Sequence, residues 1–118
     1  MKIRYRNIFL ALAVMLIASL PTHAKDKLRV VTTLTDLKSI AELIGGDKVD
    51  VFAIATGFQN PHFVDPKPSY ILKLSKADMF VTVGLDLETG WVPPLLNSAR
   101  NASVMKGGTG YVDASERV

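Results

Sequence analysis

Apolar residues along the chain fall into alternating runs that predict strands and helices in turn. Residues 28–34 are rich in β-branched side chains and alternate only weakly, which indicates a strand buried on both faces. The apolar residues within 37–44 then recur at helical spacing, after Thr35 and Asp36, which offer an N-cap and an acidic first turn. Gly45-Gly46 is predicted to end this helix.

The same alternation continues through the rest of the chain. Strands are predicted over residues 49–55 and 79–83, with a helix that opens at Pro68 and runs to Ala77 between them. A further helix is predicted from Trp91 to Arg100 and a short fourth strand over 102–105. Successive βαβ units give parallel strands, so we expect an α/β fold: a βαβ-type parallel sheet with flanking helices.

Beyond Met105 the hydrophobic period is lost. The glycine-rich segment 106–110 lacks the Gly-Lys-Ser/Thr ending of a phosphate-binding loop and is interpreted as a turn. Residues 111–118 contain few apolar side chains, and no closing helix follows the predicted fourth strand. We therefore expect the chain to be truncated.

The N-terminal segment has the three parts of a secretory signal. Basic Lys2, Arg4 and Arg6 precede an apolar run over 8–20, and small residues lead up to Ala24. The run is shorter than the roughly 20 apolar residues that span a bilayer. Residues 1–24 are therefore predicted to be a cleavable signal peptide, which leaves 25–118 as one small domain.

Charge and cysteine content narrow the possible functions. The chain has 14 Lys and Arg against 11 Asp and Glu, a net charge of +3. Three basic residues precede Ala24, so the remainder has 14 − 3 = 11 basic against 11 acidic residues, which gives no support for nucleic acid or an anionic membrane as partner. The chain has no cysteine, so a lipobox, disulfides and cysteine catalysis are excluded, and we expect a periplasmic protein without lipid attachment.

Candidate chemistry concentrates in the loop 57–69 after the second strand. His62 is the only histidine beyond the predicted signal peptide and lies among Pro61, Pro66 and Pro68. Prolines restrict the backbone, and a restricted imidazole suits a metal ligand or an acid/base group. The loop also follows the carboxyl end of a strand, where parallel sheets bind ligands. The alternative is a plain turn in which His62 binds the backbone.

Other candidate residues are weaker. Asp65 follows His62 by three positions, but metal sites need about four ligands and the predicted mature chain has one histidine. Asp86 and Glu88 are possible acid and base groups, although such residues before a helix more often cap it. Trp91 is expected to pack in the core. Any partner ligands of His62 are therefore expected to lie outside this chain.

Two stretches carry a resemblance to a known family. Residues 60–69 read Asn-Pro-His-Phe-Val-Asp-Pro-Lys-Pro-Ser, and residues 74–91 run from Leu-Ser-Lys-Ala-Asp through an apolar strand to a glycine, a glutamate and a tryptophan. Together they resemble the periplasmic metal-binding proteins of zinc and manganese ABC importers, which include the metal-transport adhesins. Asn60 stands where that family commonly has Asp, and Tyr70 where Asp often follows the serine. The resemblance extends to about Met105.

The resemblance implies a two-lobed protein whose α/β lobes are joined by a long rigid helix, with residues 25–118 as part of the N-terminal lobe. His62 would give a neutral ring nitrogen to the metal, and three later ligands would lie past Val118. The implied role is capture of Zn²⁺ or Mn²⁺ in the periplasm for delivery to a membrane ABC permease, by a monomer that is not an enzyme. This chain alone is expected to bind metal weakly or not at all.

Two other classes of protein stay open at this point. One is a small secreted hydrolytic enzyme that uses His62 with Asp65 or Glu88 as acid and base. The other is an adhesion module, which the adhesin members of the family suggest.

Overall fold

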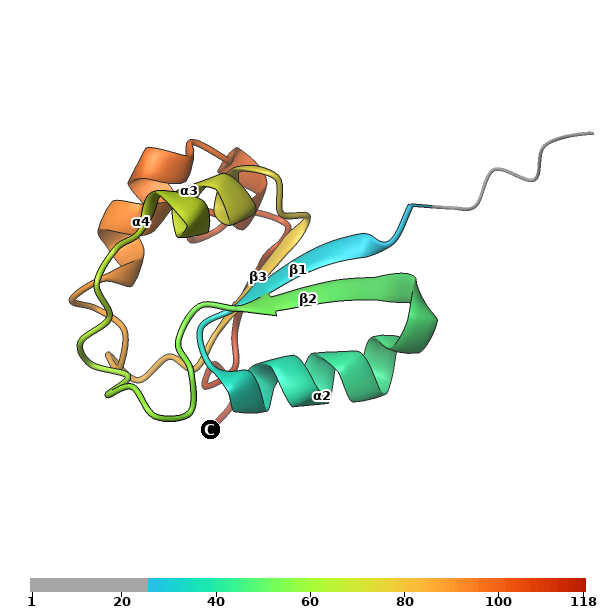
Figure 1. The fold of residues 1–118 in the computed structure, drawn as a ribbon, viewed down its shortest axis with the longest axis horizontal. Helices are drawn as coiled ribbons and strands as arrows, with labels where there is room; N and C mark the ends of the chain where they lie inside the picture. Colours follow the sequence, from blue (N-terminus) through green and yellow to red (C-terminus); the bar gives the residue numbers. More distant parts are fainter. Residues whose placement is uncertain (1–25) are drawn as a thin grey trace, which may run out of the picture.

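The computed structural model describes residues 26–118 and contains one four-stranded sheet (Figure 1). Its strands are β1 (Leu28–Thr32), β2 (Val49–Ala53), β3 (Met79–Thr82) and β4 (Tyr111–Asp113), in the order β2-β1-β3-β4. All three pairings are parallel, which confirms the predicted α/β fold. The predicted signal peptide lies outside the described residues. Within 26–118, no helix has the length and apolar character needed to cross a membrane.

Helices lie on both faces of this sheet. They are α2 (Thr35–Gly45), α3 (Pro68–Ser75) and α4 (Val92–Ala99), with short 3-10 helices η1 (Gly46–Lys48) and η2 (Ala102–Val104). Figure 1 shows α2 on one face, against β1 and β2, and α3 beside α4 on the other. The loop that carries His62 joins β2 to α3, so it begins at the carboxyl end of the sheet.

The hydrophobic core lies on the α3 and α4 side of the sheet. Phe80 of β3 is fully buried there, together with Leu74 of α3, Leu95 of α4 and Val104 of η2. Trp91, which precedes α4, belongs to the same cluster and is 4% exposed, as predicted. The core thereby joins α3, α4 and the segment before α4 to the sheet.

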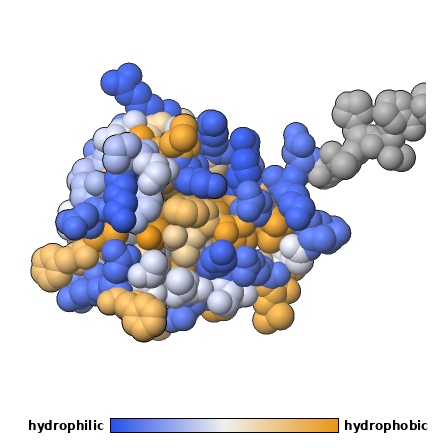
Figure 2. Space-filling model, viewed as in Figure 1, coloured by the Kyte–Doolittle hydropathy of each residue, from blue (hydrophilic) through white to orange (hydrophobic). Residues whose placement is uncertain are grey.

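Helix α2 forms where predicted but differs in burial and capping. None of its residues is buried, and Ile40, Leu43 and Ile44 are 53%, 86% and 81% exposed. Figure 2 shows apolar side chains at the surface over the part of the molecule that α2 occupies. The predicted Thr35 cap is wrong, because the N-cap is Leu34 and has no side-chain hydrogen bond. The apolar spacing therefore predicts the helix but not which of its residues are covered.

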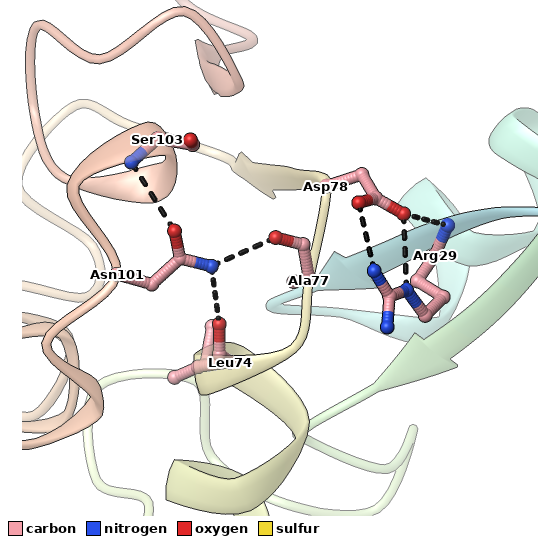
Figure 3. A network of polar contacts seen from close by, with 6 residues as sticks. All are labelled: Arg29, Leu74, Ala77, Asp78, Asn101 and Ser103. Atoms are coloured by element: carbon pink, nitrogen blue, oxygen red, sulfur yellow. Dashed lines mark hydrogen bonds and ion pairs between the residues drawn. The ribbon is translucent and has the colours of Figure 1, made fainter.

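The predicted strand over 102–105 is wrong. The segment forms η2 instead, because the Asn101 side chain accepts a hydrogen bond from Ser103 N at 3.2 Å and starts a tight turn. The same side chain donates to the carbonyls of Leu74 at 3.0 Å and Ala77 at 2.8 Å, as Figure 3 shows. Asn101 thereby ties the end of α4 to the end of α3.

The fourth strand forms later in the chain, over Tyr111–Asp113. It pairs with β3 so that Tyr111 lies opposite Phe80, and the two rings are tilted with centroids 6.1 Å apart. A Cβ at Gly110 would collide with the Asp78 carbonyl, so this close approach requires glycine. The glycine-rich segment before β4 is a series of turns, as predicted.

An ion pair joins β1 to the start of β3 at the amino end of the sheet. The Arg29 guanidinium donates to both oxygens of Asp78, at 3.0 and 3.1 Å, and the Arg29 backbone N–H donates to Asp78 at 2.9 Å (Figure 3). These hydrogen bonds hold the pKa of Asp78 below its usual value. Both side chains are partly exposed, so the pair fixes the strand register more than it adds stability.

Candidate metal-binding site

The loop between β2 and α3 is tied to the sheet at both ends. At its start, Ile54 N and Ala55 N donate to the carbonyls of Thr32 and Thr33, both at 2.9 Å, which prolongs the β1–β2 contact. At its far end, Val64 is 4% exposed and packs in the core. Between these anchors the chain projects from the carboxyl end of the sheet, where parallel α/β folds bind ligands.

His62 lies in the projecting part and is exposed. Its ring is tilted against that of Phe63, with centroids 6.4 Å apart, and Phe63 is itself 79% exposed. The backbone before the ring is held by Asn60, whose side-chain oxygen accepts from His62 N at 3.0 Å, an Asx-turn. The structure thus presents an accessible imidazole on a fixed backbone, which suits a metal ligand.

A second loop reaches the same side of the sheet after β3. Three consecutive residues of this loop, Gly84, Leu85 and Asp86, have positive φ values, of 84°, 53° and 62°. Two of these are not glycine, and left-handed backbone costs such residues about 1–2 kcal/mol each. The loop is therefore held in a strained shape by contacts elsewhere.

Glu88 supplies those contacts. It is 4% exposed, and its carboxylate accepts four hydrogen bonds from the ends of β1 and β3. The donors are Thr33 Oγ1 at 2.6 Å and Val83 N at 2.7 Å on Oε1, with Thr82 Oγ1 at 3.2 Å and Gly84 N at 3.1 Å on Oε2. The predicted capping role is wrong, because the side chain turns back to the sheet while the N-cap of α4 is Trp91.

A groove of about 340 Å³ lies between this second loop, α4 and β4. Asp113 lines it, and the Ser115 hydroxyl and backbone N–H hold the pKa of Asp113 below its usual value. Tyr111 also lines it, and burial raises the pKa of that phenol. His62 does not line this groove, so the two features are separate.

The candidate residues are not gathered into a complete metal site. Across residues 26–118, no three His, Cys, Asp or Glu side chains come close enough to hold a metal ion together. Asp65 is exposed on the His62 loop, and Glu88 is occupied by its four donors. The Asn60 side chain was not predicted to hold the backbone of His62, although an Asn side chain in a turn commonly accepts a hydrogen bond from the backbone N–H two residues later.

Comparison with known proteins shows a match to one protein family over most of the chain. A family model described as "Zinc-uptake complex component A periplasmic" matches residues 30–118. The manganese ABC transporter substrate-binding lipoprotein PsaA of Streptococcus pneumoniae is 39% identical over 79 residues, which are 64% of this chain and 26% of that protein. The iron ABC transporter substrate-binding lipoprotein MtsA of Streptococcus pyogenes serotype M1 is 35% identical over 82 residues, 67% of this chain and 26% of that protein.

Solved structures agree with these sequence relatives. A crystal structure of ZnuA superposes with a TM-score of 0.63 and 26% identity, over 79% of this chain and 34% of that one. Zn(II)-bound AdcA from Streptococcus pneumoniae superposes with a TM-score of 0.52 and 32% identity, over 62% of this chain and 16% of that one. The chain thus spans about a quarter of the length of the curated relatives described above.

Proposed function

Because the chain belongs to the family of periplasmic zinc-uptake component A proteins, we propose that it is the N-terminal part of the substrate-binding component of a metal ABC importer. In this role the protein captures Zn²⁺ or Mn²⁺ in the periplasm and delivers it to a membrane permease. The observation that carries the proposal is the exposed His62 imidazole, on a backbone fixed at the carboxyl end of the sheet.

In this proposal the neutral His62 ring gives one nitrogen to the metal, which is cargo rather than a resident cofactor. Imidazole nitrogen is a common ligand of both Zn²⁺ and other first-row ions. The remaining ligands come from parts of the protein other than residues 26–118, in which no group of metal-binding side chains assembles. Such a divided site is consistent with a cargo that must be released.

The two rival functions have less support. A hydrolytic enzyme would need a carboxylate that pairs with the His62 ring. Each Glu88 oxygen already accepts two hydrogen bonds, and among the described residues the exposed Asp65 makes no hydrogen bond to His62. The matched relatives are named as transporter components, which favours neither an enzyme nor an adhesion module. Those relatives are also named lipoproteins, while this chain has no cysteine. We propose that residues 1–24 export the chain to the periplasm, that it acts there as a monomer, and that, having no cysteine, it carries no lipid on a lipobox.

A zinc titration of the chain tests the role of His62. His23→Gln leaves His62 as the only imidazole, and its ring ¹⁵N signals then report binding directly. We expect weak, saturable shifts on addition of Zn²⁺, and we expect His62→Ala to abolish the binding, measured in parallel by calorimetry. Asp65→Asn is the control for a nearby charge change and should have a smaller effect.

Two results would contradict this reasoning. Equal zinc affinity in the chain and in His62→Ala would remove His62 from the site. A tight zinc complex with one ion per monomeric chain would show that the chain itself completes the ligand set.

A further inference from the structure

The peptide unit between Pro61 and His62 is held by side chains at both of its polar groups. Its carbonyl accepts a hydrogen bond from the indole Nε1 of Trp91 at 2.8 Å. Its N–H donates to Asn60 Oδ1 at 3.0 Å. The next N–H, that of Phe63, donates to the Asn60 carbonyl at 3.0 Å, which closes the turn. The carbonyl and the N–H of this peptide unit thus each have a side-chain partner.

The two holding groups differ in their anchorage. Asn60 is exposed and belongs to the same loop, so it fixes the turn only locally. Trp91 is 4% exposed, in the core, and lies 30 residues after Pro61, whose carbonyl it binds. The Trp91 backbone N–H donates to the Glu88 carbonyl at 3.2 Å, and the Glu88 side chain binds the ends of β1 and β3. Trp91 therefore connects the His62 turn to the sheet.

Holding this peptide plane fixes the direction in which the His62 side chain leaves the backbone. A fixed plane restricts ψ of Pro61 and φ of His62, so only the side-chain torsions of His62 remain to be ordered when it binds a ligand. Immobilising fewer torsions on binding increases affinity. A ligand held by a supporting shell of hydrogen bonds also keeps its geometry when the metal arrives.

We propose that Trp91 and Asn60 are positioning residues for His62, which hold its peptide plane so that the imidazole is ordered for a divalent metal ion. This inference rests on the proposed function, because it requires His62 to be the ligand. Neither residue touches the metal in this arrangement, and their effect passes through the backbone alone.

The test compares zinc affinities of full chains that all carry His23→Gln. Trp91→Phe keeps the ring but removes the N–H, and Asn60→Ala removes the acceptor of the His62 N–H. Asn101→Ala is the matched control, since it also removes side-chain hydrogen bonds to backbone groups, but those of Leu74, Ala77 and Ser103. Zn²⁺ binding is followed by the His62 ring ¹⁵N signals, and ¹⁵N relaxation of the His62 amide measures its mobility without metal.

We expect Trp91→Phe and Asn60→Ala each to weaken zinc binding about threefold to tenfold and to increase the mobility of the His62 amide. Asn101→Ala should change neither, although it lowers the melting temperature. Unchanged zinc affinity in both folded variants, with binding abolished by His62→Ala, would overturn the positioning role and leave the proposed function standing. If His62→Ala binds zinc as tightly as the unsubstituted protein, the positioning role and the proposed metal-ligand role of His62 are both wrong. Should Trp91→Phe not fold, Asn60→Ala decides, because Asn60 is exposed.

Discussion

Replacement of Glu88 by glutamine tests whether its carboxylate holds the loop after β3. Each carboxylate oxygen accepts one backbone N–H, from Val83 on Oε1 and from Gly84 on Oε2. The hydroxyls of Thr33 and Thr82 can turn to accept a hydrogen bond, but a backbone N–H cannot. Whichever way the new amide is placed, its NH₂ group therefore faces a backbone donor.

The less costly orientation of the glutamine points its NH₂ group at Gly84. The Gly84 N–H also donates to Thr82 Oγ1 at 3.0 Å, so it keeps a partner when the Oε2 bond is lost. Hydrogen bonds to charged groups contribute about 1.5–3 kcal/mol and neutral ones about 0.5–1.5 kcal/mol. With one such bond lost and the bonds to the retained oxygen weakened, Glu88→Gln should lower the free energy of unfolding by about 2–4 kcal/mol.

Urea unfolding at pH 7 measures this change. Far-UV circular dichroism reports the whole fold, and the fluorescence of Trp91, the single tryptophan, reports the region next to Glu88. Asp86→Asn is the matched control, because it makes the same chemical change on an exposed residue of the same loop and should stay within about 0.5 kcal/mol of wild type. A Glu88→Gln variant as stable as this control would refute the reasoning.

Three further substitutions test other parts of the fold. Asp78→Asn should lower the melting temperature at neutral pH by removing the ion pair with Arg29. Folding lowers the pKa of Asp78, so this contribution is present above the unfolded pKa of about 3.9 and is lost as the pH falls through the folded pKa; melts at successively lower pH should show the difference between the two proteins shrinking. Gly84→Ala should cost at least about 1 kcal/mol in urea unfolding, because φ is 84° and the new Cβ would meet the Asp113 side chain; unchanged stability would contradict this. Leu74→Ala should cost about 2–5 kcal/mol, because the side chain is fully buried, and a smaller loss would show that the cavity collapses.

Much of the fold follows from local pattern. The β-branched run at 28–34 and the helical spacing after Thr35 predict β1 and α2, and Pro68 opens α3 as the first helical residue. These elements form where expected because pattern, propensity and termini agree. The placement of the His62 loop at the strand ends follows from the same order of elements.

The parts that sequence did not predict depend on contacts between distant residues. Val104 continues an apolar run that resembles a strand, but the Asn101 side chain starts a 3-10 turn there and buries Val104 in the core. Glu88 resembles a helix cap locally, and only the fold brings it to Thr33, which lies 55 residues away. The hydrogen bond from Trp91 to the Pro61 carbonyl likewise joins residues 30 positions apart, so no local sequence pattern predicts it.

The central position of β1 has a consequence for how the chain folds. Val30 of β1 pairs with Val51 of β2, a separation of 51 − 30 = 21 residues, and with Met79 of β3, a separation of 79 − 30 = 49 residues. Closing the longer loop costs more entropy, so we expect the β1–α2–β2 unit to form first. Until β3 arrives, one edge of β1 has unpaired backbone groups, and unpaired strand edges promote aggregation. A strand that is interior in the finished sheet is therefore an open edge during folding, at which misassembly can begin.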